Sequence, residues 1–168
     1  ALQSVTLDAS QAAAKLNFLA GATGGVTMLG GGVNRILSIG AGGIESTNGT
    51  GPVTIGSVTD GQKVMLSLAG SQTWTNGSDN TLVVNNGVTC ASASTLTLNG
   101  GGFLFNGSIT DGSGVTALSF GGATPVTLAA TNTYSGNTTI ASGTTLVLAS
   151  DGALADLSLV EEGDPRGE

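Results

Sequence analysis

The chain has 168 residues, including 29 Gly, 23 Thr, 17 Ser and 11 Asn, and carries a formal net charge of −7 with no His. Only 4 residues are Lys or Arg, which excludes a basic track for nucleic-acid phosphates and a polybasic contact with anionic lipid. The length suits one compact domain or one short repeat array, and no apolar run approaches the roughly 20 residues of a membrane-spanning helix.

The strand-like segments follow one another along the chain with starts about ten residues apart, a spacing typical of β-sandwiches, β-barrels and β-solenoids. In most of them apolar residues alternate with Thr or Ser, which disorder does not explain, and the mean hydropathy is +0.29. QAAAK (11–15) comes nearest to a helix but is too short and uncapped. The predicted strands are 4–9, 14–19, 25–29, 35–39, 43–46, 52–56, 63–70, 72–76, 81–85, 94–99, 103–109, 115–120, 125–130, 138–141, 144–149 and 157–160.

The turns between these strands leave two all-β arrangements open. Asp-Gly pairs at 60–61, 111–112 and 151–152 suit two-residue hairpins, which would give an antiparallel sheet. Many strands, however, have only four or five residues and bend at Gly into the next with almost no loop, which favours a parallel β-helix. With three strands per turn, we expect an all-β β-solenoid of roughly five turns, each about 4.8 Å high.

One segment carries a family resemblance. NTYSGNTTIASGTTLVLASDGAL (132–154) resembles the autotransporter-associated β-strand repeat, whose usual form is an Asn-Thr-Tyr-[Ser/Thr]-Gly-Gly-Thr-Thr turn and strand, a Gly-Thr-Leu strand and a Gly-Ala-Leu corner. Asn137 replaces the second Gly of that pattern. Residues 34–46, 68–84 and 95–109 are similar to segments that precede the repeat in large secreted bacterial proteins.

The resemblance implies a right-handed parallel β-helix that is extracellular or on the outer surface of a bacterium. We expect the array to occupy residues 1–155, with a terminal strand and an acidic tail or linker at 156–168. The resemblance also implies structural turn roles for Asn132, Tyr134, Gly136 and Gly143.

The acidic residues suggest turn chemistry more than catalysis. Asp60, Asp111 and Asp151 directly precede Gly and are predicted to be structural turn residues. A carbohydrate-active β-helix enzyme would need two converging acids. Asp79 and Glu45 are the remaining candidates, but neither has a paired acid nearby in the sequence, although stacking of coils could bring distant acids together. We therefore predict no catalytic residue and no enzyme, and keep the enzyme as an alternative.

Cofactor and metal sites are not predicted either. TDGSG (110–114) and SDG (150–152) offer oxygen ligands for Ca²⁺, but no calcium-binding nonapeptide repeats along the chain. Cys90 is the sole Cys, which excludes an internal disulfide and a Cys-based metal site. It is expected to be a half-buried small residue, with an intermolecular bridge as the alternative.

Aromatic residues give one candidate ligand contact. Trp74 in QTWTN (72–76) could stack on a sugar ring if exposed, which would make the chain a glycan-binding module, but packing in a rung or corner is the favoured role. Phe103 and Phe105 lie two residues apart and are expected to share the interior face of one strand.

The ends of a β-solenoid suggest a function. Terminal rungs expose unpaired backbone groups, and residues 4–9 are already strand-like, whereas VEEGDPRGE (160–168) could be a solvated tail, a linker or an end-blocking device. We expect a structural β-solenoid that serves as a filament subunit, stalk or adhesin segment. It is expected to self-associate head to tail through its open sheet ends, with polysaccharide or cell-surface contact as a further partner.

Overall fold

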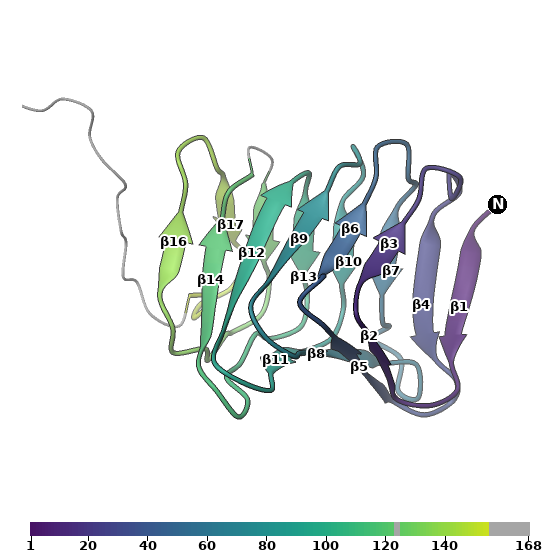
Figure 1. Ribbon diagram of the computed structural model, residues 1–168, viewed down its shortest axis with the longest axis horizontal. Helices are drawn as coiled ribbons and strands as arrows, with labels where there is room; N and C mark the ends of the chain where they lie inside the picture. The colour runs from purple at the N-terminus through teal and green to yellow at the C-terminus, as the bar shows by residue number, and fades with distance from the viewer. Residues whose placement is uncertain (123–124, 155–168) are drawn as a thin grey trace, which may run out of the picture.

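The computed structural model describes residues 1–122 and 125–154, and this part of the chain consists of short strands joined by turns, with no helix (Figure 1). The strands form three sheets that extend along the long axis of the molecule. Every strand pairing in them is parallel. The predicted all-β parallel β-helix is therefore confirmed, and the antiparallel alternative is wrong.

The three sheets differ in the number of strands they contain. The seven-stranded sheet contains, in spatial order, β1 (Gln3–Leu7), β4 (Val26–Gly30), β7 (Val53–Ile55), β10 (Leu82–Val84), β13 (Phe103–Phe105), β15 (Val126–Leu128) and β17 (Leu146–Leu148). The six-stranded sheet contains β3 (Leu16–Phe18), β6 (Ile44–Ser46), β9 (Gln72–Asn76), β12 (Ser94–Gly100), β14 (Thr116–Phe120) and β16 (Thr138–Ile140). The four-stranded sheet contains β2 (Gln11–Ala13), β5 (Arg35–Ile39), β8 (Val64–Leu68) and β11 (Val88–Cys90).

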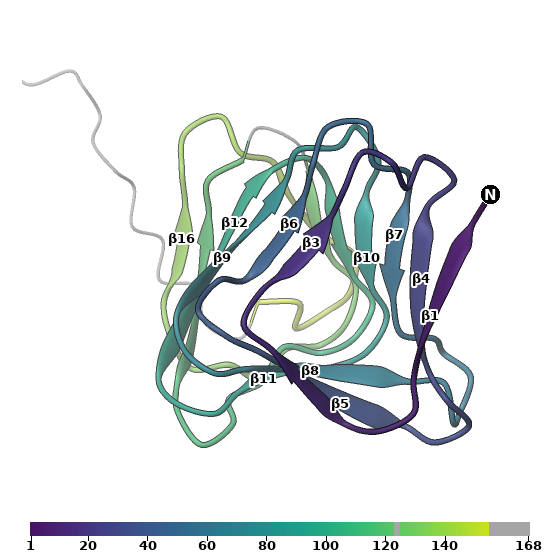
Figure 2. The same ribbon diagram turned by 45° about the vertical axis from the view of Figure 1, so that its right-hand side comes forward.

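Each coil visits the seven-stranded, the four-stranded and the six-stranded sheet in turn. In Figure 2 the chain passes from β1 down to the four-stranded sheet and across to β3, turning clockwise as it recedes from the viewer, so the solenoid is right-handed. Residues paired across adjacent coils lie between 20 and 30 positions apart in the sequence.

The solenoid has about six coils, and β17 begins a further one. The first four coils place a strand in each sheet, whereas in the next two the four-stranded sheet is continued only by the single bridges Val88–Ile109 and Thr110–Thr133. The predicted strands divided by three give one coil fewer, because these two coils contain only two strands each and the prediction omits β2 and β11 in two earlier coils.

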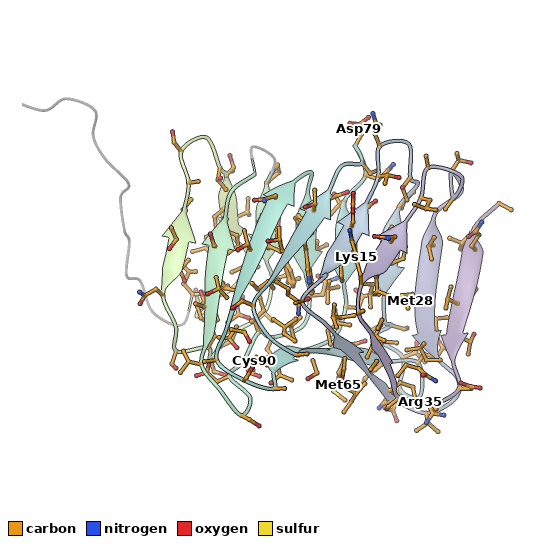
Figure 3. All side chains as sticks on the ribbon, in the orientation of Figure 1. Lys15, Met28, Arg35, Met65, Asp79 and Cys90 are labelled. Carbon is orange, nitrogen blue, oxygen red and sulfur yellow. The ribbon has the colours of Figure 1, made fainter. Side chains whose placement is uncertain are left out.

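The interior is built from side chains that point inward at every second position of a strand. Strands β7, β10 and β13 accordingly alternate buried, partly exposed and buried residues. Met28 on β4 points into the interior, whereas Met65 on β8 points away from it (Figure 3). The in-register pairing stacks the inward residues of successive coils into columns, and these columns form the core.

Buried amides bind adjacent coils together where the chain turns a corner. The side chain of Asn86 accepts a hydrogen bond from the backbone N–H of Val64 at 2.9 Å and donates one to the carbonyl of Ser57 at 3.0 Å. Both partners belong to the preceding coil. Such bonds satisfy backbone groups that a bend removes from the sheet ladder, which explains the Asn residues at the corners.

Two strands were missed in the sequence. β2 lies in the Ala-rich segment that came nearest to a helix, and it pairs with β5. β11 lies in the polar stretch around Cys90 and pairs with β8. Both strands have only three residues, and pairing with a five-residue neighbouring strand fixes their extended conformation.

The Asp-Gly pairs close no hairpin in the described chain. Gly61 and Gly152 have positive φ angles of 77° and 72°, which turn the chain toward its next face. The predicted strand at 157–160 and the predicted tail at 156–168 lie outside the described residues.

Candidate functional site: the two ends of the solenoid

The N-terminal end of the solenoid presents unpaired strand edges around an apolar opening. β1 is paired to β4, β2 to β5 and β3 to β6, and none of the three has a described strand on its other side. An open cavity of about 600 Å³ is lined by residues of β1, β3 and β4 and of the turn between β3 and β4. Its apolar lining includes Val5, Leu16, Phe18, Leu19, Val26 and Met28.

The apolar character of this end follows from the column arrangement. Val5 pairs in register with Met28, which pairs with Ile55, so Val5 is the first member of an inward column. Val5 is 42% exposed, whereas Met28 is 5% and Ile55 0% exposed. Val5 is exposed because no coil precedes the first one in the described chain, and not because its side chain points outward.

The last described strand shows the same situation at the opposite end. β17 pairs with β15 and has no described strand on its other side. Leu148 on β17 is 47% exposed, although it is in register with Leu128, which is 1% exposed. Leu148 therefore terminates the column that Val5 begins, which we call the Val5–Leu148 column.

The predicted turn residue Asn132 joins the last coils. Its Oδ1 accepts a hydrogen bond from the backbone N–H of Ile109 at 2.6 Å, and its Nδ2 donates to the carbonyl of Ala153. Its own backbone N–H donates to the carbonyl of Gly152 at 2.9 Å. Asn132 is 4% exposed, so one side chain links three successive coils from inside the corner.

The other residues of the repeat-like segment also serve packing and turning. Tyr134 is buried, and its hydroxyl lies 2.8 Å from Oγ1 of Thr138. The backbone N–H of Gly136 donates to the carbonyl of Thr116 at 2.9 Å, and a Cβ on Gly136 would overlap that carbonyl. Gly143 lies in a turn with a positive φ of 79°, which favours glycine.

Asp111 fixes the corner between two coils. Its Oδ1 accepts the backbone N–H of Thr116 at 2.7 Å, and its Oδ2 accepts the hydroxyl of Ser135 at 2.5 Å, in the following coil. The backbone N–H of Ser135 lies 3.1 Å from both carboxylate oxygens. These donors, the Ser135 hydroxyl foremost, hold the pKa of Asp111 below its ordinary value because they stabilise the ionised carboxylate.

Asp60 and Asp151 lie in turns. Oδ1 of Asp60 accepts a hydrogen bond from Nδ2 of Asn34 at 2.7 Å and lies 3.6 Å from Nζ of Lys63. The Asn34 bond, followed by the Lys63 charge, lowers the pKa of Asp60. Asp151 contributes its backbone carbonyl, which accepts the hydroxyl of Thr131 at 3.0 Å. No contact joins the carboxylates of Asp60, Asp111 and Asp151, which lie in different coils.

The glycan-contact hypothesis for Trp74 is wrong. Trp74 is 0% exposed and stacks on Phe105, with 5.9 Å between ring centroids and 18° between ring planes. Its Nε1 donates to Oε1 of Gln72 at 2.8 Å. Trp74 alternates with Thr73 and Thr75 along β9, and this alternation indicates an inward indole. Phe103 and Phe105 share the interior, as predicted.

Cys90 is more deeply buried than predicted, at 2% exposure. Its thiol donates to the carbonyl of Gly114 at 2.8 Å and accepts the hydroxyl of Thr116 at 3.0 Å. A thiol enclosed in this way is inaccessible to a second chain, so the intermolecular-bridge alternative is wrong for the folded molecule. In the described part of the chain, no three His, Cys, Asp or Glu residues gather as a metal site would require.

Comparisons with known proteins give no match for this chain: no family model, no curated protein and no solved structure is significantly similar to it. Within residues 1–122 and 125–154 there is also no helix with the length and apolarity needed to cross a membrane.

Proposed function

We propose that the chain is a structural β-solenoid, secreted or displayed on the outer cell surface, that serves as a stalk, adhesin segment or filament subunit. The observation that carries the proposal is the continuity of the stack. The inward columns of the seven-stranded sheet pass from coil to coil through every described turn. In a fold of this kind each coil contacts only its neighbours, so adding coils lengthens the molecule without changing its cross-section. This property suits a stalk or a filament.

The use of the polar side chains supports a structural role. The carboxylate of Asp111 accepts hydrogen bonds from donors in two coils. The carboxylate of Glu45 accepts a hydrogen bond from Nζ of Lys15, in the preceding coil, at 2.6 Å. The buried side chains of Gln72 and Asn132 bind backbone groups of neighbouring coils. These groups are engaged in holding coils together, which suits a scaffold.

The proposed location follows from the resemblance of residues 132–154 to the autotransporter-associated repeat. It is tested by labelling intact cells of the source organism with an antibody raised against the folded chain. We expect surface labelling that external protease removes, with a cytoplasmic protein as the unlabelled control. Labelling that requires permeabilised cells would overturn the proposal.

A further inference from the structure

The two ends of the molecule complement each other along the Val5–Leu148 column. Val5 and Leu148 are 42% and 47% exposed, whereas the three middle members Ile55, Val84 and Phe105 are at most 1% exposed. Both side chains belong to an inward column, and in the described chain each lacks a neighbour on one side. A second copy placed end to end would supply the missing neighbour to each.

The backbone edges also match in direction. In the seven-stranded sheet, the backbone groups of residues with inward side chains form hydrogen bonds with the following coil. The N–H of Gln3, for example, donates to the carbonyl of Gly25. The backbone groups of residues with outward side chains form hydrogen bonds with the preceding coil. The carbonyl of Thr145, for example, accepts a hydrogen bond from the N–H of Val126. By this alternation, the free edge of β17 presents the groups of Leu146 and Leu148, and that of β1 presents those of Ser4 and Thr6.

Within the described residues, neither free edge carries the usual protection against pairing. Edge strands of soluble proteins are commonly blocked by Lys, Pro or a bulge, because unpaired N–H and C=O groups attract another strand. β1 has the sequence QSVTL and β17 has LVL, with no charged residue and no Pro in either. The apolar opening beside β1 adds a surface whose exposure to water is unfavourable.

We propose that the C-terminal end of one copy of this chain docks on the N-terminal end of another, with β17 pairing in parallel to β1. The register that continues the sheet places Leu148 over Val5 and Val147 beside Ser4. This contact joins two different surfaces and does not close, so it adds copies in a linear series. The inference deepens the proposed function by naming its partner, a second copy, and it rests on that function.

A pair of substitutions on one strand tests the contact. Leu148 and Val147 are similarly exposed, at 47% and 40%, but only Leu148 points into the column. Sedimentation velocity of the full chain over a range of concentrations measures the association. We expect Leu148→Lys and Val5→Lys to weaken it at least about tenfold, and Val147→Lys to change it by less than about threefold. Far-UV circular dichroism checks that each variant is folded.

Cysteine crosslinking tests the register. In the proposed contact Ser4 and Val147 are neighbours on adjacent strands, and adjacent Cα atoms about 4.8 Å apart are within the range for a disulfide. Oxidation of the double variant Ser4→Cys/Val147→Cys should give a ladder of covalent multimers. The matched control Thr54→Cys/Val147→Cys keeps one end position and moves the other to the middle of the sheet, and should give no ladder.

Three outcomes would overturn the docking proposal. These are a wild-type chain that remains monomeric at high concentration, closed dimers that Leu148→Lys does not weaken, and an equal effect of Val147→Lys and Leu148→Lys. Each leaves the surface labelling of cells unaffected, so a failure of the docking is distinguishable from a failure of the proposed function.

Discussion

The middle coils and the first coil use the same pattern of inward residues but differ in how well they bury them. Leu16 in β3, Ile44 in β6 and Trp74 in β9 occupy one column of the six-stranded sheet. Leu16 is only partly buried, whereas Ile44 and Trp74 are at most 1% exposed. Burial in this fold comes from having a coil on both sides, and the end coils therefore contribute less stability per residue.

The largest expected difference between the two regions is the cost of removing an inward side chain. Trp74→Ala should destabilise the chain by about 3–5 kcal/mol, because it deletes a fully buried indole and its stacking on Phe105. Val5→Ala in the first coil should cost less than about 1 kcal/mol, because Val5 is 42% exposed. Urea unfolding followed by far-UV circular dichroism measures both.

Trp74→Phe serves as the control for this comparison, since it retains an aromatic ring and should cost less than the alanine variant. Equal costs for Val5→Ala and Trp74→Ala would contradict the idea that neighbouring coils determine burial. Dilute protein is required, because end-to-end association would bury Val5 and raise its cost.

A second difference in stability is expected between a buried corner amide, Asn132, and an exposed one, Asn106. Asn132→Ala should destabilise by about 2–4 kcal/mol, because it leaves the N–H of Ile109 and the carbonyl of Ala153 unpaired in a buried corner. The matched control is Asn106→Ala, since Asn106 is exposed and its side chain donates only to Asn85. The control should cost less than about 0.5 kcal/mol. Thermal unfolding of the two variants measures both costs. Similar losses of stability would show that the hydrogen bonds of Asn132 contribute little to the stability of the fold.

Much of the fold could be predicted because the strands alternate strongly. The predicted strands 35–39 and 72–76 coincide with β5 and β9. In β9 the exposed Thr73 and Thr75 alternate with three buried residues, with Trp74 at the centre. β2 (QAA) and β11 (VTC) were not predicted because each has only three residues and is flanked by small residues, so no alternation stands out along the sequence. Their conformation is imposed by pairing with neighbouring coils.

The candidate site was harder to predict because it depends on the register between coils. That Val5 and Leu148 end the same column follows from six successive pairings across turns of unequal length, which alternation within a strand does not specify. The Asp111–Ser135 bond spans 24 residues for the same reason. The burial of Trp74, in contrast, was accessible from its alternation with Thr73 and Thr75.

Two of the three glycines of the repeat-like segment, Gly136 and Gly143, separate the effect of crowding between coils from the effect of backbone conformation. Gly136→Ala should cost about 2 kcal/mol, because the added Cβ overlaps the carbonyl of Thr116 in the preceding coil. Gly143→Ala should cost about 1 kcal/mol, because its surroundings are open and only its positive φ opposes a side chain. Urea midpoints of the two variants, at unchanged slope, measure the difference. A larger loss for Gly143→Ala would mean that turn conformation outweighs coil contact.

The smallest expected effect concerns pH and the Asp111 corner. The hydrogen bonds from Ser135 and Thr116 lower the pKa of Asp111 in the folded chain, so the ionised group stabilises the fold at neutral pH. This stabilisation is present above the unfolded value of about 4 and is lost as pH falls through the lower folded value. Asp111→Asn removes the titrating group, so the variant should be less stable than wild type at pH 7 and should lose less stability on acidification to about pH 3.

Asp151→Asn is the control, because only the backbone carbonyl of Asp151 takes part in its turn contact, and its acid dependence should match that of the wild type. Parallel acid profiles for wild type and Asp111→Asn would mean that these bonds do not couple the protonation of Asp111 to the joining of its two coils.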